Sequence, residues 1–227
     1  MFIGHYGPAV WDAHRADGVK LWHGILAVQL IDIVTMVLTL LRIEGVSPPA
    51  THPLAFDTPY SHSLVGSLLI AAVGALAYRV KRPTTGWKGA GLIGGLVFSH
   101  WVLDLIVHRP DMPILPGGDT LLGMGLWNYA WPTYALEVLL LGGMVAWWLS
   151  VTRGPVWTTV VAWIVVAVMS VLQFFVITAP TLAYQSDGTL PPPAEPAVAI
   201  PGLVIFFGLA GVFALLERKR GPRSDRP

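Results

Sequence analysis

The chain has 227 residues, of which 54% are hydrophobic and 12% are charged, and its mean hydropathy is +0.64. Soluble proteins carry about 25% charged residues, so the composition excludes an ordinary water-soluble enzyme and indicates an integral membrane protein. The formal charge of +1 gives no sign of nucleic-acid binding. The absence of cysteine excludes a disulfide framework, a thiol nucleophile and a cysteine-ligated metal.

Apolar runs long enough to cross a bilayer recur along the whole sequence, since about 20 helical residues span the hydrocarbon core. We therefore predict an all-α fold: a polytopic transmembrane helix bundle of about six spanning helices, preceded by a short N-terminal surface or re-entrant helix. The predicted spans are residues 22–42, 62–80, 88–108, 132–151, 156–178 and 199–216.

The pattern divides the chain into three parts. Residues 1–21 hold polar side chains such as Asp12 and Arg15, so we expect an interfacial or re-entrant segment. Residues 22–151 are expected to form a four-helix membrane core that carries a metal site. Residues 152–227 are expected to add a two-helix scaffold with a basic cytoplasmic tail.

The basic residues predict the orientation of these spans, because cytoplasmic loops are enriched in lysine and arginine. With a cytoplasmic N-terminus, all 14 lysines and arginines except Arg42 and Arg109 fall on the cytoplasmic side. We therefore expect a multi-pass protein of the cytoplasmic (inner) membrane with both termini in the cytoplasm.

Ionisable side chains interrupt several spans, where they are costly and usually mark a site. His100 and Asp104 are four residues apart and share one helix face. Asp32 lies near the middle of the first span and His62 opens the second, at a similar depth. Imidazole and carboxylate ligands together suit a divalent metal ion, with zinc favoured and manganese or iron as alternatives.

Plainer roles stay open for each of these residues. His100 and Asp104 could form a hydrogen-bonded pair or part of a proton relay. Ser61 could cap the second helix, and His62 alone could be an interface histidine. Asp32 could pair with a basic side chain of a neighbouring helix.

Further candidates depend on how the chain folds back on itself. His5 reaches the site only if the first segment is re-entrant. Glu137, about two turns into the fourth span, and Asp57, in a polar turn, are candidate general bases. His108 and Arg109 follow the third span and are candidates to stabilise developing charge or a leaving group. Arg109 is equally compatible with a structural ion pair.

The chain carries, in this order, Gly4-His5, Asp32 in the first span, Tyr60-Ser61-His62-Ser63 and Ser99-His100-x-x-x-Asp104. This pattern resembles the YdjM-like family of inner-membrane metal-dependent hydrolases over about residues 1–150. The resemblance implies that the metal ligands are His5, Asp32, His62, His100 and Asp104. The chain departs from the family pattern where a second aspartate is usual near Asp32, and it has Ser61 in place of threonine.

Together these observations predict a membrane-embedded metal-dependent hydrolase that uses metal-activated water. A site in the outer half of the bilayer favours a lipid or lipid-linked substrate, for example a phosphoester, with membrane lipids as its surroundings. Two alternatives remain open: an ion- or proton-coupled transporter using the same buried residues, and a non-catalytic membrane scaffold. A stoichiometric metal that survives purification would favour the enzyme.

Overall fold

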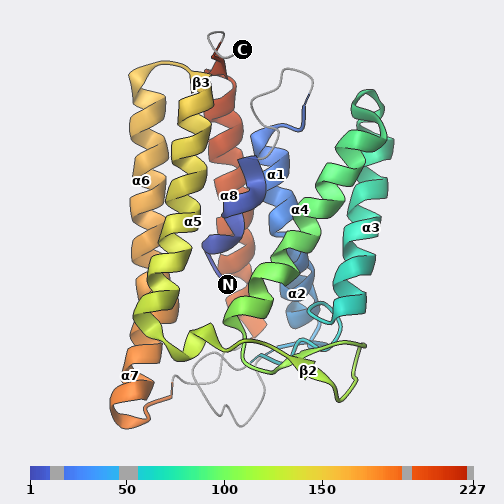
Figure 1. The fold of residues 1–227 in the computed structure, drawn as a ribbon, viewed down its shortest axis with the longest axis vertical. Coiled ribbons are helices and arrows are strands. Elements are labelled where there is room, and N and C mark those ends of the chain that lie inside the picture. The colour runs from blue at the N-terminus through green and yellow to red at the C-terminus, as the bar shows by residue number, and fades with distance from the viewer. Residues whose placement is uncertain (11–17, 46–55, 191–195, 224–227) are drawn as a thin grey trace.

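The computed structural model describes residues 1–10, 18–45, 56–190 and 196–223, and these form a helical bundle (Figure 1). Five helical segments are long and apolar enough to span a membrane, and a bent pair makes a sixth candidate span. All six predicted spans are therefore confirmed as helices, and the chain is a candidate multi-pass membrane protein. The segments are α1 (Leu21–Val28) with α2 (Leu30–Leu40), α3 (Leu64–Lys81), α4 (Gly86–Val107), α5 (Ala130–Val151), α6 (Val156–Gln173) continuing into α7 (Ala179–Asp187), and α8 (Ala199–Glu217).

The first span is broken at Gln29, where α1 and α2 meet at an angle of 49°. Gln29 has φ −102° and ψ 3°, outside the helical range, and its side chain is buried. The last carbonyl groups of a helix have no partner within it. The break therefore frees the carbonyl of Val28 inside the bundle, and it brings Asp32 into the first turn of α2.

The first residues enter the bundle as a 3-10 helix, η1 (Gly4–Val10), which packs against α1, α4 and α5. Its approach to α1 is close, because a Cβ atom on Gly24 would lie 2.4 Å from the Ala9 carbonyl oxygen. Ile3, Tyr6 and Ala9 are buried in the main core. Residues 11–17, which carry the polar part of the predicted N-terminal segment, lie outside the described residues.

The fifth span is longer than the predicted 156–178, because α6 continues through a π-helical segment, η4 (Phe174–Thr178), into α7. Pro180 follows this segment. Proline lacks an N–H and its ring collides with the carbonyl four residues earlier, so the wider π turn accommodates it. The segment places Val176 and Ile177 beside the cavity described below.

Short elements close the two ends of the bundle. At one end, β1 (Met112–Pro113) pairs antiparallel with β2 (Leu121–Leu122), followed by η3 (Leu126–Asn128). At the other end, β3 (Thr152–Arg153) pairs with β4 (Gly221–Pro222), and the α3–α4 turn with η2 (Pro83–Thr85) lies at this same end of the bundle (Figure 1). One further 3-10 turn, η5 (Pro196–Val198), precedes α8.

The described basic residues gather at the β3–β4 end. Lys20 precedes α1, a run of lysines and arginines ends α3, and another follows α8. Arg42 and Arg109 follow α2 and α4 and lie towards the opposite end, as the sequence predicts. The predicted orientation, in which this end faces the cytoplasm, depends on this distribution and stays a prediction.

Candidate metal centre

Four histidines and two aspartates gather at one place inside the bundle. They form three overlapping groups, and in each group the ligand atoms lie within 4.8 Å of one another. The groups are His5–His100–Asp104, Asp32–His62–His100 and His62–Asp104–His108. The structure thus brings together all five predicted ligands and adds His108, which the sequence suggested for a different role.

Four segments supply these side chains. His5 lies on η1, Asp32 in the first turn of α2, and His62 in the turn before α3. His100 and Asp104 lie one turn apart on α4, and His108 is its C-cap. The site therefore lies near the end of the bundle that carries β1 and β2, opposite the basic end (Figure 1).

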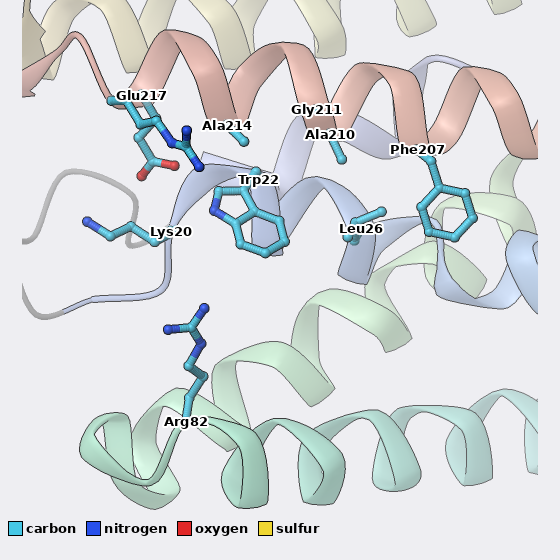
Figure 2. Close-up of a pocket in the computed structure, with 10 residues that line it drawn as sticks. Lys20, Trp22, Leu26, Arg82, Phe207, Ala210, Gly211, Ala214 and Glu217 are labelled. Atoms are coloured by element: carbon cyan, nitrogen blue, oxygen red, sulfur yellow. The ribbon is translucent and has the colours of Figure 1, made fainter.

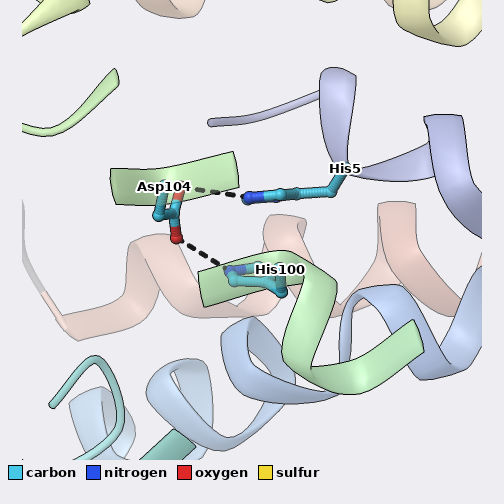
Figure 3. A group of neighbouring side chains, drawn as sticks. All are labelled: His5, His100 and Asp104. Atoms are coloured by element: carbon cyan, nitrogen blue, oxygen red, sulfur yellow. Dashed lines mark hydrogen bonds and ion pairs between the residues drawn. The ribbon is translucent and has the colours of Figure 1, made fainter. Parts of the chain in front are cut away.

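Asp104 is the centre of the cluster. Its Oδ1 atom lies 3.0 Å from His5 Nε2 and 3.7 Å from His108 Nε2. Its Oδ2 atom lies 3.1 Å from His100 Nε2 and 3.3 Å from His62 Nε2. Figure 3 shows the Asp104 carboxylate contacting both His5 and His100. The rings of these two histidines stack with centroids 3.5 Å apart. The amine of Met1 also contacts Asp104.

Asp32 provides the second carboxylate. Its Oδ1 atom lies 3.4 Å from His100 Nε2 and 3.5 Å from His62 Nε2. The side chain of Asp32 is 15% exposed, whereas that of Asp104 is 1% exposed. Asp32 is thus the carboxylate of the cluster that is more accessible from outside.

Two histidines are anchored through the ring nitrogen that faces away from the cluster. His100 Nδ1 lies 2.7 Å from the Val28 carbonyl oxygen that the α1–α2 break exposes. A carbonyl only accepts, so this contact places the proton on Nδ1 and leaves a lone pair on Nε2. His108 Nδ1 lies 2.8 Å from the Asp111 carboxylate, with the same consequence.

His62 is anchored through a longer chain of groups. Ser61 Oγ donates to Glu44 Oε2 over 2.6 Å and lies 3.0 Å from His62 Nδ1. Because the serine proton is directed at the carboxylate, its oxygen is the acceptor for a proton on His62 Nδ1. Nε2 of His62 therefore also faces the cluster with a lone pair.

Glu44 was not identified from the sequence, although its side chain is buried. Its Oε1 atom accepts from the backbone N–H groups of Tyr60 and Ser61, each over 2.8 Å. Thr35 completes the network with an Oγ1 contact of 2.8 Å to Ser61 Oγ. The position of Glu44 just beyond an apolar span is the sequence signal that could have drawn attention to it.

The cluster has the properties expected of a metal site. His5 Nδ1, His100 Nε2 and Asp104 Oδ2 are buried and form no hydrogen bond with the described residues. Buried polar atoms without partners are rare, and an unseen ion is one explanation for them. These His and Asp groups can hold a divalent metal ion.

Three of the predicted site residues lie elsewhere. Glu137 on α5 is buried and accepts backbone N–H bonds from Phe2 (2.7 Å) and Gly4 (3.1 Å). Asp57 is exposed and its backbone pairs with Gly45. The side chain of Arg109 is half-buried and donates to Asn128 over 2.7 Å. None of the three belongs to the groups of close ligand atoms among the described residues.

A cavity of about 320 Å³ adjoins the cluster. Asp32, His62, Asp104 and His108 line it on one side. The remaining wall is mostly apolar and comes largely from η3, η4 and α8. It includes Phe56, Trp127, Val176, Ile177, Ile205 and Phe206. The C-terminal helices therefore form part of the cavity beside the candidate metal ligands.

Comparisons of the chain with family models, with curated proteins and with solved structures find no match.

Proposed function

We propose that the protein is a metal-dependent hydrolase of the cytoplasmic membrane, acting on a lipid or lipid-linked phosphoester. One observation carries the proposal. His62, His100 and His108 each anchor Nδ1 on another group and turn Nε2 towards Asp104. Metal-binding histidines almost always hydrogen-bond their other ring nitrogen in this way, which fixes the tautomer and the orientation of the ring.

The proposed ligands are His5, Asp32, His62, His100, Asp104 and His108. Zinc, manganese and iron accept this mixture of nitrogen and oxygen donors. A divalent ion supplies a Lewis acid for a phosphoryl oxygen and lowers the pKa of water towards neutrality. The order of motifs that resembles the YdjM-like hydrolases supports the same chemistry.

The residues around the cavity position the reacting group. Asp32 lines the cavity and is more exposed than Asp104, so a group entering the cavity meets Asp32 at the edge of the cluster. Glu44, Val28 and Asp111 keep the three imidazoles in place. Preorganised ligands of this kind need no rearrangement when the substrate arrives.

The wall of the cavity supports a lipid substrate. Phe56, Trp127, Ile177, Ile205 and Phe206 offer apolar surface next to the carboxylates. A phosphoester with a long hydrocarbon chain fits a cavity that is apolar on one side and carries carboxylates on the other. Its hydrocarbon chain is stabilised by contact with the apolar wall, and its phosphate faces the cluster.

The experiment is an activity assay on detergent-purified protein, stripped with a chelator and reloaded with zinc, manganese or iron. Long-chain lipid phosphoesters and short-chain analogues are offered in mixed micelles. We expect metal-dependent release of the alcohol or phosphate, absent in His100→Ala. His23→Ala is the control, since His23 contacts Tyr78 outside the cluster. If metal-loaded protein cleaves none of these phosphoesters, the proposed reaction is wrong.

A second candidate is an ion- or proton-coupled transporter. The 49° break beside Asp32 favours it, because many transporter sites are built at discontinuous helices. Ion flux into proteoliposomes that requires Asp32, together with a metal that dialyses away readily, would support the transporter over the hydrolase.

A further inference from the structure

A second cavity lies at the basic end of the bundle, away from the metal centre. It is a groove of about 600 Å³ lined by α1, α8 and the end of α3 (Figure 2). In Figure 2, Lys20, Arg82 and Glu217 lie towards one end of the groove, and Leu26 and Phe207 lie towards the other. The groove is thus polar at one end and apolar at the other.

The polar end carries an excess of positive charge. Lys20, Arg82 and Arg218 line the groove and are exposed, against one acidic residue, Glu217. Three basic groups less one acidic group leave a formal charge of +2. Within the described part of the chain, none of these three cations forms an ion pair with a carboxylate.

Glu217 has a structural task that accounts for its presence. Its Oε1 atom accepts from the backbone N–H of Leu21 over 3.1 Å. The first N–H groups of a helix lack partners within it, so Glu217 caps the start of α1. The basic side chains around it remain available for an anion.

The apolar end is open because of small residues on α8. Ala210, Gly211 and Ala214 line the groove, and a Cβ atom on Gly211 would meet no atom within 4 Å. Leu26 of α1 and Phe207 of α8 complete this surface. The result is a channel along α8 in which a hydrocarbon chain meets apolar side chains.

Trp22 lies between the two ends (Figure 2). Tryptophan is enriched at the level of lipid headgroups, where its ring has apolar and polar neighbours. The groove is also at the end of the candidate spans, close to the basic residues that end α3 and follow α8. Its charged part is therefore placed at a membrane surface and its apolar part within the bilayer.

We propose that this groove binds an anionic phospholipid. The phosphate is held between Lys20, Arg82 and Arg218, and one acyl chain follows α8 past Gly211 towards Phe207. Basic side chains at a membrane surface attract anionic lipids, and the groove adds a specific place for the chain. The proposal is independent of the metal centre, so the His100→Ala protein is expected to bind the lipid as the wild type does.

Native mass spectrometry of the full chain in detergent tests this site. Phosphatidylglycerol is titrated against phosphatidylcholine with identical acyl chains, and inorganic phosphate is added in a separate series. We expect the wild type to prefer phosphatidylglycerol. In the triple variant Lys20→Gln/Arg82→Gln/Arg218→Gln its apparent affinity should fall about 100-fold, because each basic residue contributes about a factor of five.

Two matched controls separate the groove from general effects of charge and helix composition. Lys81→Gln/Lys88→Gln/Lys219→Gln removes the same number of charges from the same end without touching the groove lining. Gly211→Leu fills the channel, whereas Gly208→Leu places the same side chain on α8 outside the lining, also in open space. Gly211→Leu should weaken lipid binding about tenfold through lost apolar contact, and Gly208→Leu should not.

Equal affinity for the two lipids would overturn the proposal, as would equal losses in the groove variants and their controls. Competition by millimolar phosphate alone would show that the basic cluster recognises a free anion and not a lipid. Because a Cβ atom at position 211 meets no other atom within 4 Å, the comparison of Gly211→Leu with Gly208→Leu tests the proposal even if the triple variant folds poorly.

Discussion

The carboxylate of Glu44 lies 2.6 Å from the hydroxyl of Ser61, and this contact sets the protonation of His62. Ser61 gives its proton to Glu44 and so receives one from His62 Nδ1 over 3.0 Å. His62 Nε2, the nitrogen that faces Asp32 and Asp104, is left free to bind a metal. A buried glutamate outside the cluster therefore supports one of its ligands.

The variant Glu44→Gln reverses this chain of hydrogen bonds. The amide oxygen must accept from the Tyr60 and Ser61 N–H groups, as Oε1 does now, so the NH₂ group faces Ser61. Ser61 then donates to His62 Nδ1, and the proton moves to Nε2. Loss of a hydrogen bond that orients a metal ligand typically weakens metal binding about 10- to 100-fold. A competition titration with a metal chelator would measure this change in affinity.

Asp119→Asn is the control for Glu44→Gln, because Asp119 is exposed in the loop between β1 and β2. It removes one negative charge at the same end of the bundle and should leave metal affinity unchanged. If the wild type and Glu44→Gln bind the metal with equal affinity, Glu44 does not determine the tautomer of His62 and serves only to hold the turn at Tyr60 and Ser61 in place.

Glu137 holds the helix that carries His5, because it accepts two backbone N–H bonds from residues 2 and 4. Glu137→Gln keeps an oxygen acceptor, and we expect it to retain the fold, the metal and any turnover. Glu137→Ala leaves both donors buried without partners, at a cost of about 1–3 kcal/mol each. Thermal melting in detergent with metal analysis would follow both variants.

The alternative role of Glu137 gives the opposite pattern. If Glu137 were the general base that its position in the fourth span suggested, Glu137→Gln would abolish turnover while melting and metal content stayed normal. The glutamine variant therefore distinguishes a positioning residue from a proton acceptor.

The cavity wall on α8 offers a test of the proposed lipid substrate. Ile205 lines the cavity, whereas its neighbour Val204 is 66% exposed on the outside of the bundle. Ile205→Trp should raise KM for a long-chain phosphoester about tenfold, since two lost methylene contacts have about that effect. Val204→Trp should not, and both variants should keep their metal. An unchanged KM in Ile205→Trp would place the acyl chain outside this cavity.

The spans were predictable because their length and apolarity are local properties of the sequence. Asp32, His62, His100 and Asp104 were equally visible, since an ionisable side chain in an apolar span needs a partner. These four side chains converge because they lie at a similar depth in neighbouring spans, and that depth can be read from the positions of the residues in the predicted spans.

Other features depend on contacts between distant residues. His5 reaches the site because Glu137, more than 130 residues away, holds its helix inside the bundle. Glu44 is buried because it caps the turn at Tyr60 and Ser61. The first span bends at Gln29 without a proline or glycine at the break, so no local signal marked it.

Metal analysis of the detergent-purified protein is the most direct test of the metal centre. The wild type would be measured after exposure to zinc, manganese and iron, beside His100→Ala/Asp104→Ala and the control His23→Ala. We expect about one or two ions per chain in the wild type and in His23→Ala, and none in the double variant. A well-folded wild type that retains no metal, or a double variant that retains as much as the wild type, would contradict the site.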